Sequence, residues 1–333
     1  MTRATVLGTG SWGTAFAATM ADAGTDVTMW GRSPGVVAQI NDGVNDEYLP
    51  GISLPGIRAT SDAAEALHRS DIVVLAVPSQ TLRDNLAGWA ELVPGDAAVV
   101  SLMKGIELGT TKRMSEVIAE VGLVEAERVV VVSGPNLARE IAEKHPAASV
   151  VACIEESTAQ RVARACVTAY FRPYTNDDVI GTELGGAVKN VVALAVGMAE
   201  GMGMGDNSKA SLITRGLAET ARLGAALGAD PATLMGLAGV GDLIATCMSP
   251  LSRNRTFGIN LGRGMSVEEV VKVTSQTAEG VRSCESILQL AHDHGVDLPI
   301  VEAVVGVVLG QVTPRGMVRA LMDRSLRSEG RER

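Results

Sequence analysis

The 333-residue chain has few aromatic residues, few cysteines and no long uninterrupted apolar run. Phe, Trp and Tyr make up 3% of it, so its cores must be built from aliphatic side chains and methionine. The cysteines show no C-x-x-C spacing; they are Cys153, Cys166, Cys247 and Cys284. In a chain of this length they predict reduced thiols in a cytoplasmic protein, rather than a disulfide scaffold or a zinc site.

The sequence also lacks the marks of membrane or nucleic-acid proteins. No stretch of about 18 consecutive apolar residues is present, so we expect no transmembrane helix. The first ten residues, MTRATVLGTG, lead directly into a strand-like segment and do not read as a signal peptide. Acidic residues outnumber basic ones by 38 to 29, which argues against a nucleic-acid partner but allows a local basic pocket for a phosphate.

Metal and hydrolase motifs are absent too. The histidines have no zinc spacing beyond a weak H-x-H pair; they are His68, His145, His292 and His294. No G-x-S-x-G or P-loop motif is present. We therefore expect no metal and no hydrolase or kinase chemistry.

Strand-like and helix-like segments alternate through the first half of the chain. Strands are expected over 4–8, 27–30, 71–77, 97–102, 129–133 and 148–153, with crossover helices between them. This pattern predicts an α/β fold with a Rossmann-type, doubly wound, mostly parallel sheet. After about residue 180 the periodicity is helical, which predicts an all-α C-terminal domain. We expect domains over 1–180 and 181–326, and a frayed tail over 327–333.

A complete G-x-G-x-x-G motif lies between the first strand and the first helix. Its glycines are Gly8, Gly10 and Gly13. The first glycine allows a tight turn, the second lets the backbone approach a pyrophosphate, and the third allows close helix packing. In this strand-turn-helix context the motif predicts dinucleotide binding. A glycine-rich turn without a ligand is the alternative.

The end of the second strand bears on which dinucleotide is bound. A strict NAD site usually has Asp or Glu there, but this segment reads Met29-Trp30-Gly31-Arg32-Ser33. Arg32 lies where a 2′-phosphate would be, which favours NADPH or the use of both NADPH and NADH. Arg32 could also be an ordinary solvated loop arginine.

The most apolar stretch, LGGAVKNVVALAVGM at 184–198, contains one charged residue, Lys189. Burial of an amine in apolar surroundings generally lowers its pKa, which suits proton transfer near neutral pH. A second apolar segment contains one carboxylate, Asp242, which is the simplest partner for that lysine, and Thr246 lies one turn further on. The alternatives are a lysine that reaches out to solvent and an aspartate that caps a helix beginning at Leu243.

Two more basic segments could complete a site. Lys104 follows an expected strand end, where ligands bind in doubly wound sheets. The run Ser252-Arg253-Asn254-Arg255 offers donors that suit a phosphate or a carboxylate. Each could instead be a solvated loop.

The chain resembles the bacterial type of NAD(P)+-dependent glycerol-3-phosphate dehydrogenase. The matching segments cover nearly the whole chain in the family's order: GTGSWGTA at 8–15, LMKGIE at 102–107, SGPNLARE at 133–140, LGGAVKNVVALAVGM at 184–198, ITRGLAE at 213–219, GVGDLIATC at 239–247, SRNRTFG at 252–258 and AEG at 278–280. The resemblance implies reversible reduction of dihydroxyacetone phosphate to sn-glycerol 3-phosphate, the backbone of glycerophospholipids. It also implies a homodimer formed through the helical domain.

The resemblance implies roles for individual residues. The lysine matching Lys189 is the proton acceptor, and residues matching Lys104, Asp242 and Thr246 complete the catalytic group. Substrate-binding positions match Lys104, Gly134, Asn136, Lys189, Asp242, Ser252, Arg253 and Asn254. Cofactor-binding positions match Ser11, Trp12, Arg32, Lys104, Ala138, Arg253, Thr277 and Glu279, besides the three motif glycines. Asn136 stands where the family usually has Thr or Ser, and Met103 where a small residue is common.

Two other functions fit parts of the pattern. A related two-domain dehydrogenase could act on a 3-hydroxy acid or on ketopantoate, whose carboxylate Arg253 could bind. A silent NADPH sensor that binds a partner protein would need the glycine motif but not Lys104, Lys189 and Asp242 together.

Overall fold

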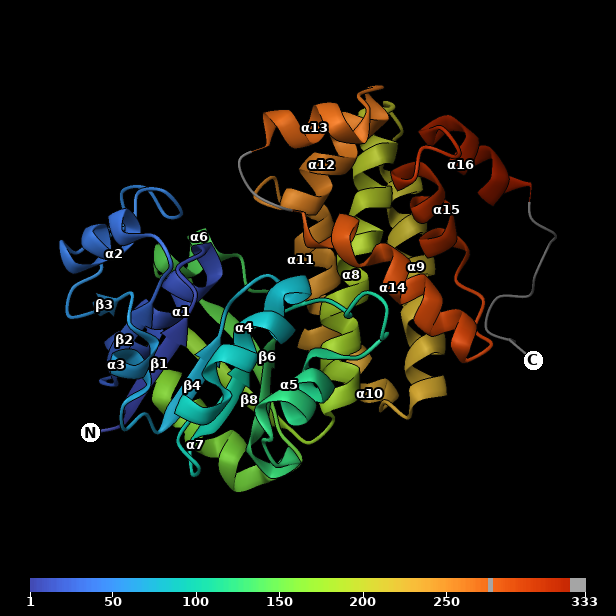
Figure 1. Ribbon diagram of the computed structural model, residues 1–333. Helices are drawn as coiled ribbons and strands as arrows, with labels where there is room; N and C mark the ends of the chain where they lie inside the picture. Colours follow the sequence, from blue (N-terminus) through green and yellow to red (C-terminus); the bar gives the residue numbers. More distant parts are fainter. Residues whose placement is uncertain (275–277, 324–333) are drawn as a thin grey trace.

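The computed structural model describes residues 1–274 and 278–323. It consists of a lobe built around a β-sheet and a lobe of helices, with the long helix α8 (Val179–Gly201) rising through the helical lobe (Figure 1). The expected tail over 327–333 lies outside the described residues. The expected α/β fold followed by an all-α region is confirmed.

The sheet has eight strands in the order β3-β2-β1-β4-β5-β6-β7-β8. Their bounds are β1 Arg3–Leu7, β2 Asp26–Trp30, β3 Arg58–Thr60, β4 Ile72–Leu75, β5 Ala98–Ser101, β6 Val129–Ser133, β7 Ala147–Ala152 and β8 Phe171–Asn176. All neighbouring strands are parallel except β6 and β7, which are antiparallel. Chain order reverses direction between β1 and β4, the switch point at which doubly wound sheets bind ligands.

The central strands are apolar throughout because helices cover both faces of the sheet. In β4, for example, Ile72 and Val74 face one layer of helices and Val73 and Leu75 face the other. The first layer contains α1 (Ser11–Asp22), α6 (Ala138–Ala142) and α7 (Glu156–Cys166). The second contains α3 (Ala63–Leu67), α4 (Leu82–Trp89) and α5 (Met114–Gly122).

Several short elements were not expected from the sequence. They are β3, β8, α2 (Pro34–Asn41), α6, α12 (Arg253–Gly262) and α16 (Pro314–Met322). Strand β8 reads FRPYTN and only Phe171 in it is buried, so it lacks the apolar run by which a buried strand is recognised. Its place at the sheet edge explains the difference, because an edge strand needs one partner and little burial.

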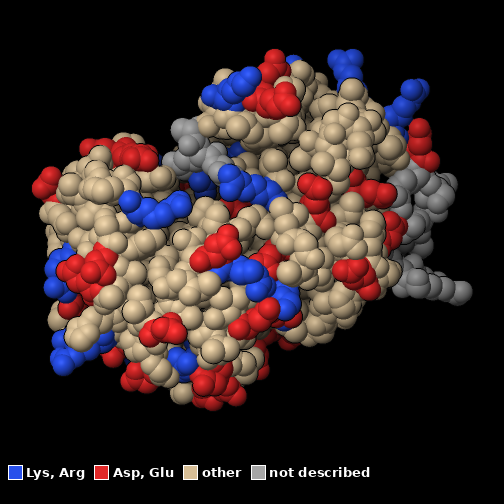
Figure 2. All heavy atoms as spheres, in the orientation of Figure 1, with Lys and Arg blue, Asp and Glu red and all other residues tan. Residues whose placement is uncertain are grey.

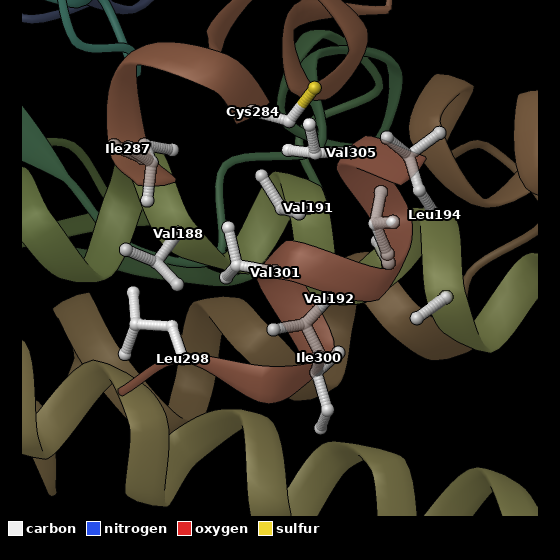
Figure 3. Packing of buried hydrophobic residues seen from close by; sticks show 14 of the residues in the cluster. Val188, Val191, Val192, Leu194, Cys284, Ile287, Leu298, Ile300, Val301 and Val305 are labelled. Carbon is white, nitrogen blue, oxygen red and sulfur yellow. The ribbon is translucent and has the colours of Figure 1, made fainter. Parts of the chain in front are cut away.

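In the helical lobe, the other helices pack around α8. They are α9 (Asp206–Leu227), α10 (Pro231–Leu234), α11 (Asp242–Met248), α12, α13 (Val267–Val273), α14 (Glu279–Asp293), α15 (Pro299–Val308) and α16. Figure 3 shows Val188, Val191 and Val192 of α8 packed against side chains of α14 and α15. Aliphatic side chains dominate this core, as the low aromatic content predicts.

Small residues let α8 approach its neighbours closely. A Cβ atom added to Gly197 would lie 2.2 Å from the carbonyl oxygen of Arg255 in α12, and one added to Gly258 would lie 2.2 Å from that of Leu194. The two backbones therefore touch where they cross.

Among the described residues, two apolar segments are long enough to span a membrane by length and composition alone, although the sequence predicts no transmembrane helix. They are α8 and the stretch Pro231–Met248. The apolar window of α8 is 89% buried inside the protein, so its composition is explained by its place at the centre of the helical lobe. All four cysteines are free thiols, as expected, and all four are buried.

Candidate active site

The candidate site lies at the carboxyl edge of the sheet, facing the helical lobe. The glycine motif follows β1, Lys104 follows β5 and Gly134 follows β6, so parallel strands bring these segments to one edge. Helices α8, α11, α12 and α14 supply further polar side chains. Figure 2 shows acidic and basic side chains mixed over the visible face, with basic ones in the hollow where the two lobes meet.

The glycine motif forms a tight turn with open space at its centre. Gly8 has a φ of +124°, and a Cβ there would lie 2.4 Å from the carbonyl oxygen of Ala76. Nothing lies within 4 Å of the position that a Cβ on Gly10 would take. Gly10 also precedes the first turn of α1, whose N-terminal N–H groups receive no side-chain cap. Open space beside uncapped N–H groups at a helix N-terminus suits a pyrophosphate.

A loop between α2 and β3 folds over this turn. The Asn45 amide donates to the Thr9 carbonyl at 3.0 Å and to the Thr14 hydroxyl at 2.9 Å, and the Ser11 hydroxyl donates to the Tyr48 carbonyl at 2.9 Å. The Trp12 indole Nε1 is buried and has no hydrogen-bond partner in the described part of the chain. The turn therefore fits a dinucleotide, with a donor left over beside it.

Lys189 is buried and paired, and does not reach out to solvent. It lies midway along α8 with its side chain 9% exposed, and its ammonium pairs with Asp242 Oδ1. The same ammonium donates to the Thr246 hydroxyl at 2.7 Å. The partner chosen from the sequence is therefore correct.

Asp242 takes a second lysine on its other oxygen. The Lys104 ammonium lies 2.6 Å from Asp242 Oδ2 and donates to the Gly134 carbonyl at 2.9 Å. Asp242 is 1% exposed, and its side chain does not cap α11, which excludes the helix-cap alternative. Burial lowers the pKa of Lys104 to about 8, and the nearby Lys189 charge adds to this effect while the Asp242 carboxylate opposes it.

A π-helical turn places Asp242. It covers Leu237–Gly241, directly before α11, and it follows α10 with only two residues between. A Cβ on Gly239 would lie 1.8 Å from the Leu234 carbonyl oxygen, so this packing requires glycine. Single π turns often occur at functional sites, because they shift the register of a helix.

The run at 252–255 divides its residues between different tasks. Ser252 caps α12 by accepting the Arg255 N–H at 3.2 Å. Arg255 makes two hydrogen bonds to Glu200 of α8, at 2.6 and 3.0 Å, so it serves packing between helices. Arg253 is exposed at the start of α12; loss of hydration lowers the pKa of its guanidinium, and the charge of the nearby Glu279 opposes this effect. Of the two arginines, Arg253 alone is exposed toward solvent.

Asn254 belongs to a chain of amides. Its Nδ2 donates to Asn190 Oδ1 at 2.9 Å, and its Oδ1 accepts the Gly280 N–H at 2.9 Å. Asn190 Nδ2 donates in turn to the Lys104 carbonyl at 3.1 Å. The expected contact of Asn254 with substrate therefore competes with a bridging role among α8, α12, α14 and the Lys104 loop.

The other expected residues lie around the same edge. Ala138 begins α6, and Glu279 begins α14 and accepts the Ser79 hydroxyl at 2.9 Å. Burial raises the pKa of Glu279. The Asn136 amide donates to the Ser149 hydroxyl at 3.1 Å, while its buried Oδ1 has no partner among the described residues. Arg32 is exposed beyond β2, and Thr277 lies outside the described residues.

Sequence reasoning missed a buried ion pair between the two lobes. Glu183 of α8 pairs with Arg113 at 2.9 Å and accepts the Ser115 hydroxyl at 2.6 Å and its N–H at 2.8 Å. Glu183 is six residues before Lys189 in a mostly apolar helix, so the sequence could have identified it as a second buried charge that needs a partner.

In residues 1–274 and 278–323, no cluster of three or more His, Cys, Asp or Glu side chains suits a metal ion.

Comparisons with known proteins agree over nearly the whole chain. Residues 3–159 match the family model of the NAD-dependent glycerol-3-phosphate dehydrogenase N-terminus, and 178–319 match that of its C-terminus. The glycerol-3-phosphate dehydrogenase (NAD(P)+) of Streptomyces griseus subsp. griseus is 64% identical over 99% of this chain and 98% of its own length.

Solved structures are similar as well. The crystal structure of glycerol-3-phosphate dehydrogenase from Coxiella burnetii has a TM-score of 0.92 at 34% identity, over 97% of this chain and 99% of that one. A ketopantoate reductase from Ralstonia eutropha has a TM-score of 0.60 at 16% identity, over 93% and 97% of the two chains, which shows a shared fold alone.

Proposed function

Because the chain belongs to the NAD-dependent glycerol-3-phosphate dehydrogenase family, we propose that Lys104, Lys189 and Asp242 form its catalytic centre. The protein is an NAD(P)+-dependent oxidoreductase that reversibly reduces dihydroxyacetone phosphate to sn-glycerol 3-phosphate. The product is the backbone of glycerophospholipids. When bound, the nicotinamide supplies the hydride for C2 of the substrate.

One observation carries the proposal: two lysines from opposite halves of the chain share the two oxygens of one buried carboxylate. Two ammonium groups and one carboxylate leave the site with one excess positive charge. Such an excess favours the negative charge that develops on the carbonyl oxygen during reduction. A purely structural ion pair would need only one of the two lysines.

Lys189 is the proposed proton donor. During reduction a proton moves from its Nζ to the substrate oxygen at C2, and the neutral amine takes a proton back in the reverse reaction. Asp242 and Thr246 fix the direction of its N–H bonds, which leaves one donor for the substrate. General acid catalysis of this kind contributes about 10²–10⁴-fold to the rate.

Lys104 and Arg253 would hold the substrate. Lys104 retains most of its charge at pH 7, because its pKa of about 8 lies above that pH, and it lies beside the Gly134 carbonyl. Arg253 is exposed at the start of α12, where the N-terminal N–H groups also favour an anion. A phosphate held there would position the reacting carbon through binding at the unreactive end of the substrate.

A steady-state assay with the variant Lys189→Met tests the catalytic centre. We expect NADPH oxidation at 340 nm with dihydroxyacetone phosphate to fall by about 10²–10⁴-fold. NADPH affinity, measured by fluorescence titration, should stay within about twofold, because the variant leaves the glycine turn intact and Asp242 still paired with Lys104. Turnover near the wild-type rate would overturn the assignment of Lys189.

We propose three further properties. The division at residue 180 into a dinucleotide-binding and a catalytic domain is supported by the passage from β8 to α8 at 176–179. A cytoplasmic location is supported by four free thiols.

A homodimer through the helical lobe is supported by four exposed apolar side chains around α10 and α11: Met235, Ile244, Met248 and Leu251. Light scattering on the wild type and on Ile244→Glu tests the dimer, because a dimer formed there should dissociate.

A further inference from the structure

The segment that carries Lys104 extends out of the sheet lobe and contacts the helical lobe. After Lys104 the chain forms a small hairpin, closed by an antiparallel bridge between Ile106 and Arg113, before α5 begins. Figure 1 shows this segment reaching toward α8 and α14. The hairpin therefore connects the carboxyl edge of the sheet with the helical lobe.

Ile106 inserts into the core of the other lobe. Its side chain is 0% exposed and belongs to the cluster that surrounds α8. Every other buried member of that cluster among the described residues comes from residue 184 or later. The Ile106 carbonyl is also fixed, because it accepts the Ser286 hydroxyl of α14 at 2.8 Å and the Gln80 amide at 2.8 Å.

The link between Ile106 and Lys104 is short and leaves little freedom. Only Gly105 lies between them, and a Cβ there would come within 2.4 Å of the Ser79 hydroxyl and 2.7 Å of the Ser283 hydroxyl. The Lys104 carbonyl is held by Asn190 at 3.1 Å. A shift of Ile106 within the apolar cluster around α8 would therefore move the backbone of Lys104.

We propose that Ile106 is a positioning residue for the reduction, because its insertion into the helical core fixes where the Lys104 ammonium stands between Asp242 and Gly134. This role rests on the proposed function of Lys104. The packing of the helical lobe thereby sets the geometry of a charge that the sheet lobe contributes. Burial is also the main cause of the lowered pKa of Lys104, so a looser hairpin should raise that pKa.

The test compares Ile106→Ala with Ile300→Ala, a truncation of the same size in the same core at the start of α15. Both variants should lower the melting temperature. Only Ile106→Ala should lower kcat for dihydroxyacetone phosphate, by about tenfold or more, since small misplacements of a catalytic group are costly. It should also move the alkaline fall of kcat to higher pH, while Ile106→Val should restore most of the activity. Equal kcat values and pH profiles for the two alanine variants would overturn the proposal.

Two further variants keep the test decisive if Ile106→Ala does not fold. Ser286→Ala removes one hydrogen bond to the Ile106 carbonyl without opening the core, and we expect a smaller loss of kcat with the same shift of pH profile. In a Lys104→Met background, Ser286→Ala should cost no further kcat, whereas an additive loss would show that the hairpin acts elsewhere than through Lys104. If Lys104→Met alone has normal kcat, the proposed function of Lys104 is itself wrong. If Lys104→Met lowers kcat while the Ile106 and Ser286 variants keep normal kcat, only the positioning role of Ile106 is overturned.

Discussion

The glycine turn and the lysine cluster meet at the same edge of the sheet, but they are assembled in opposite ways. The turn uses the backbone of six consecutive residues, Gly8–Gly13, and is shaped by the absence of side chains. The cluster uses side chains that are far apart in the chain: Asp242 is 53 positions from Lys189 and 138 from Lys104. A local backbone site should therefore tolerate changes in the packing of the two lobes, while the cluster should not.

The largest expected effect separates the two regions at Asp242. In Asp242→Asn both lysines lose their charge partner while size and shape are kept. Removing one partner of a buried ion pair lowers the free energy of unfolding by about 3–5 kcal/mol, since the remaining charge is uncompensated. We expect turnover to fall by about 10³-fold, within the range reported for loss of a preorganised electrostatic group.

NADPH binding is the control for that variant. Because the glycine turn does not contact Asp242, the dissociation constant for NADPH should change by less than about threefold, or roughly 0.6 kcal/mol. A variant that loses NADPH binding in proportion to turnover would show that the two regions are one coupled unit.

The converse change is made at Gly10. Since nothing lies within 4 Å of the Cβ position there, Gly10→Ala should fold normally and keep its melting temperature. The added methyl group occupies the open space beside the α1 N-terminus, so we expect NADPH affinity to fall by about tenfold, roughly 1.4 kcal/mol. Calorimetry with NADPH measures the affinity.

Gly8→Ala is the matched variant. It has a clash with the Ala76 carbonyl and a φ of +124°, so it should lower both the melting temperature and NADPH affinity. Equal losses of melting temperature in Gly8→Ala and Gly10→Ala would contradict the distinction between them. In that distinction Gly8 is needed for the conformation of the turn, while Gly10 leaves space for the cofactor.

The pH dependence sharpens the comparison on the side of the lysines. Lys104 is protonated below its pKa of about 8 and loses its charge as the pH rises through that value. We expect kcat/KM for reduction to fall above pH 8, approaching about tenfold per pH unit for a single essential proton. A profile that stays flat to pH 9.5 would contradict a requirement for charged Lys104.

The same shift acts on stability with the opposite sign. Because the folded pKa of Lys104 lies below the unfolded value of 10.5, the unfolded state binds more protons between about pH 8 and 10.5. The contribution of Lys104 to the free energy of unfolding therefore rises with pH in that window. Lys104→Met should remove this rise in urea titrations.

The smallest expected effect concerns Arg32, which is exposed beyond β2. If it binds the phosphate that distinguishes NADPH from NADH, Arg32→Ala should raise KM for NADPH by about fivefold, near the 1 kcal/mol limit of an exposed ion pair. KM for NADH should not change. Assays at 340 nm with each cofactor measure the two KM values. Equal changes of KM for NADPH and NADH would argue against a role of Arg32 in cofactor selectivity.

Much of the architecture followed from local patterns. Apolar runs bounded by glycine turns predicted the central strands, and a change to helical periodicity near residue 180 predicted the helical lobe. Strand β8 and helix α12 were missed, because an exposed edge strand and a helix that begins at Ser252 with a basic run have little periodic signal. Lys189 and Asp242 could be paired in advance because each was the one charge in an apolar segment.

The sequence alone determined the dinucleotide turn, since its geometry depends on six neighbouring residues and on the steric freedom of glycine. It also singled out the buried charges, because an apolar segment does not keep a charge without a partner. Only the tertiary structure decided that one carboxylate holds two lysines, that Asn254 is joined to Asn190, and that Ile106 crosses into the other core. These contacts join residues far apart in the chain, and their distances are set by how the two lobes pack rather than by any local preference.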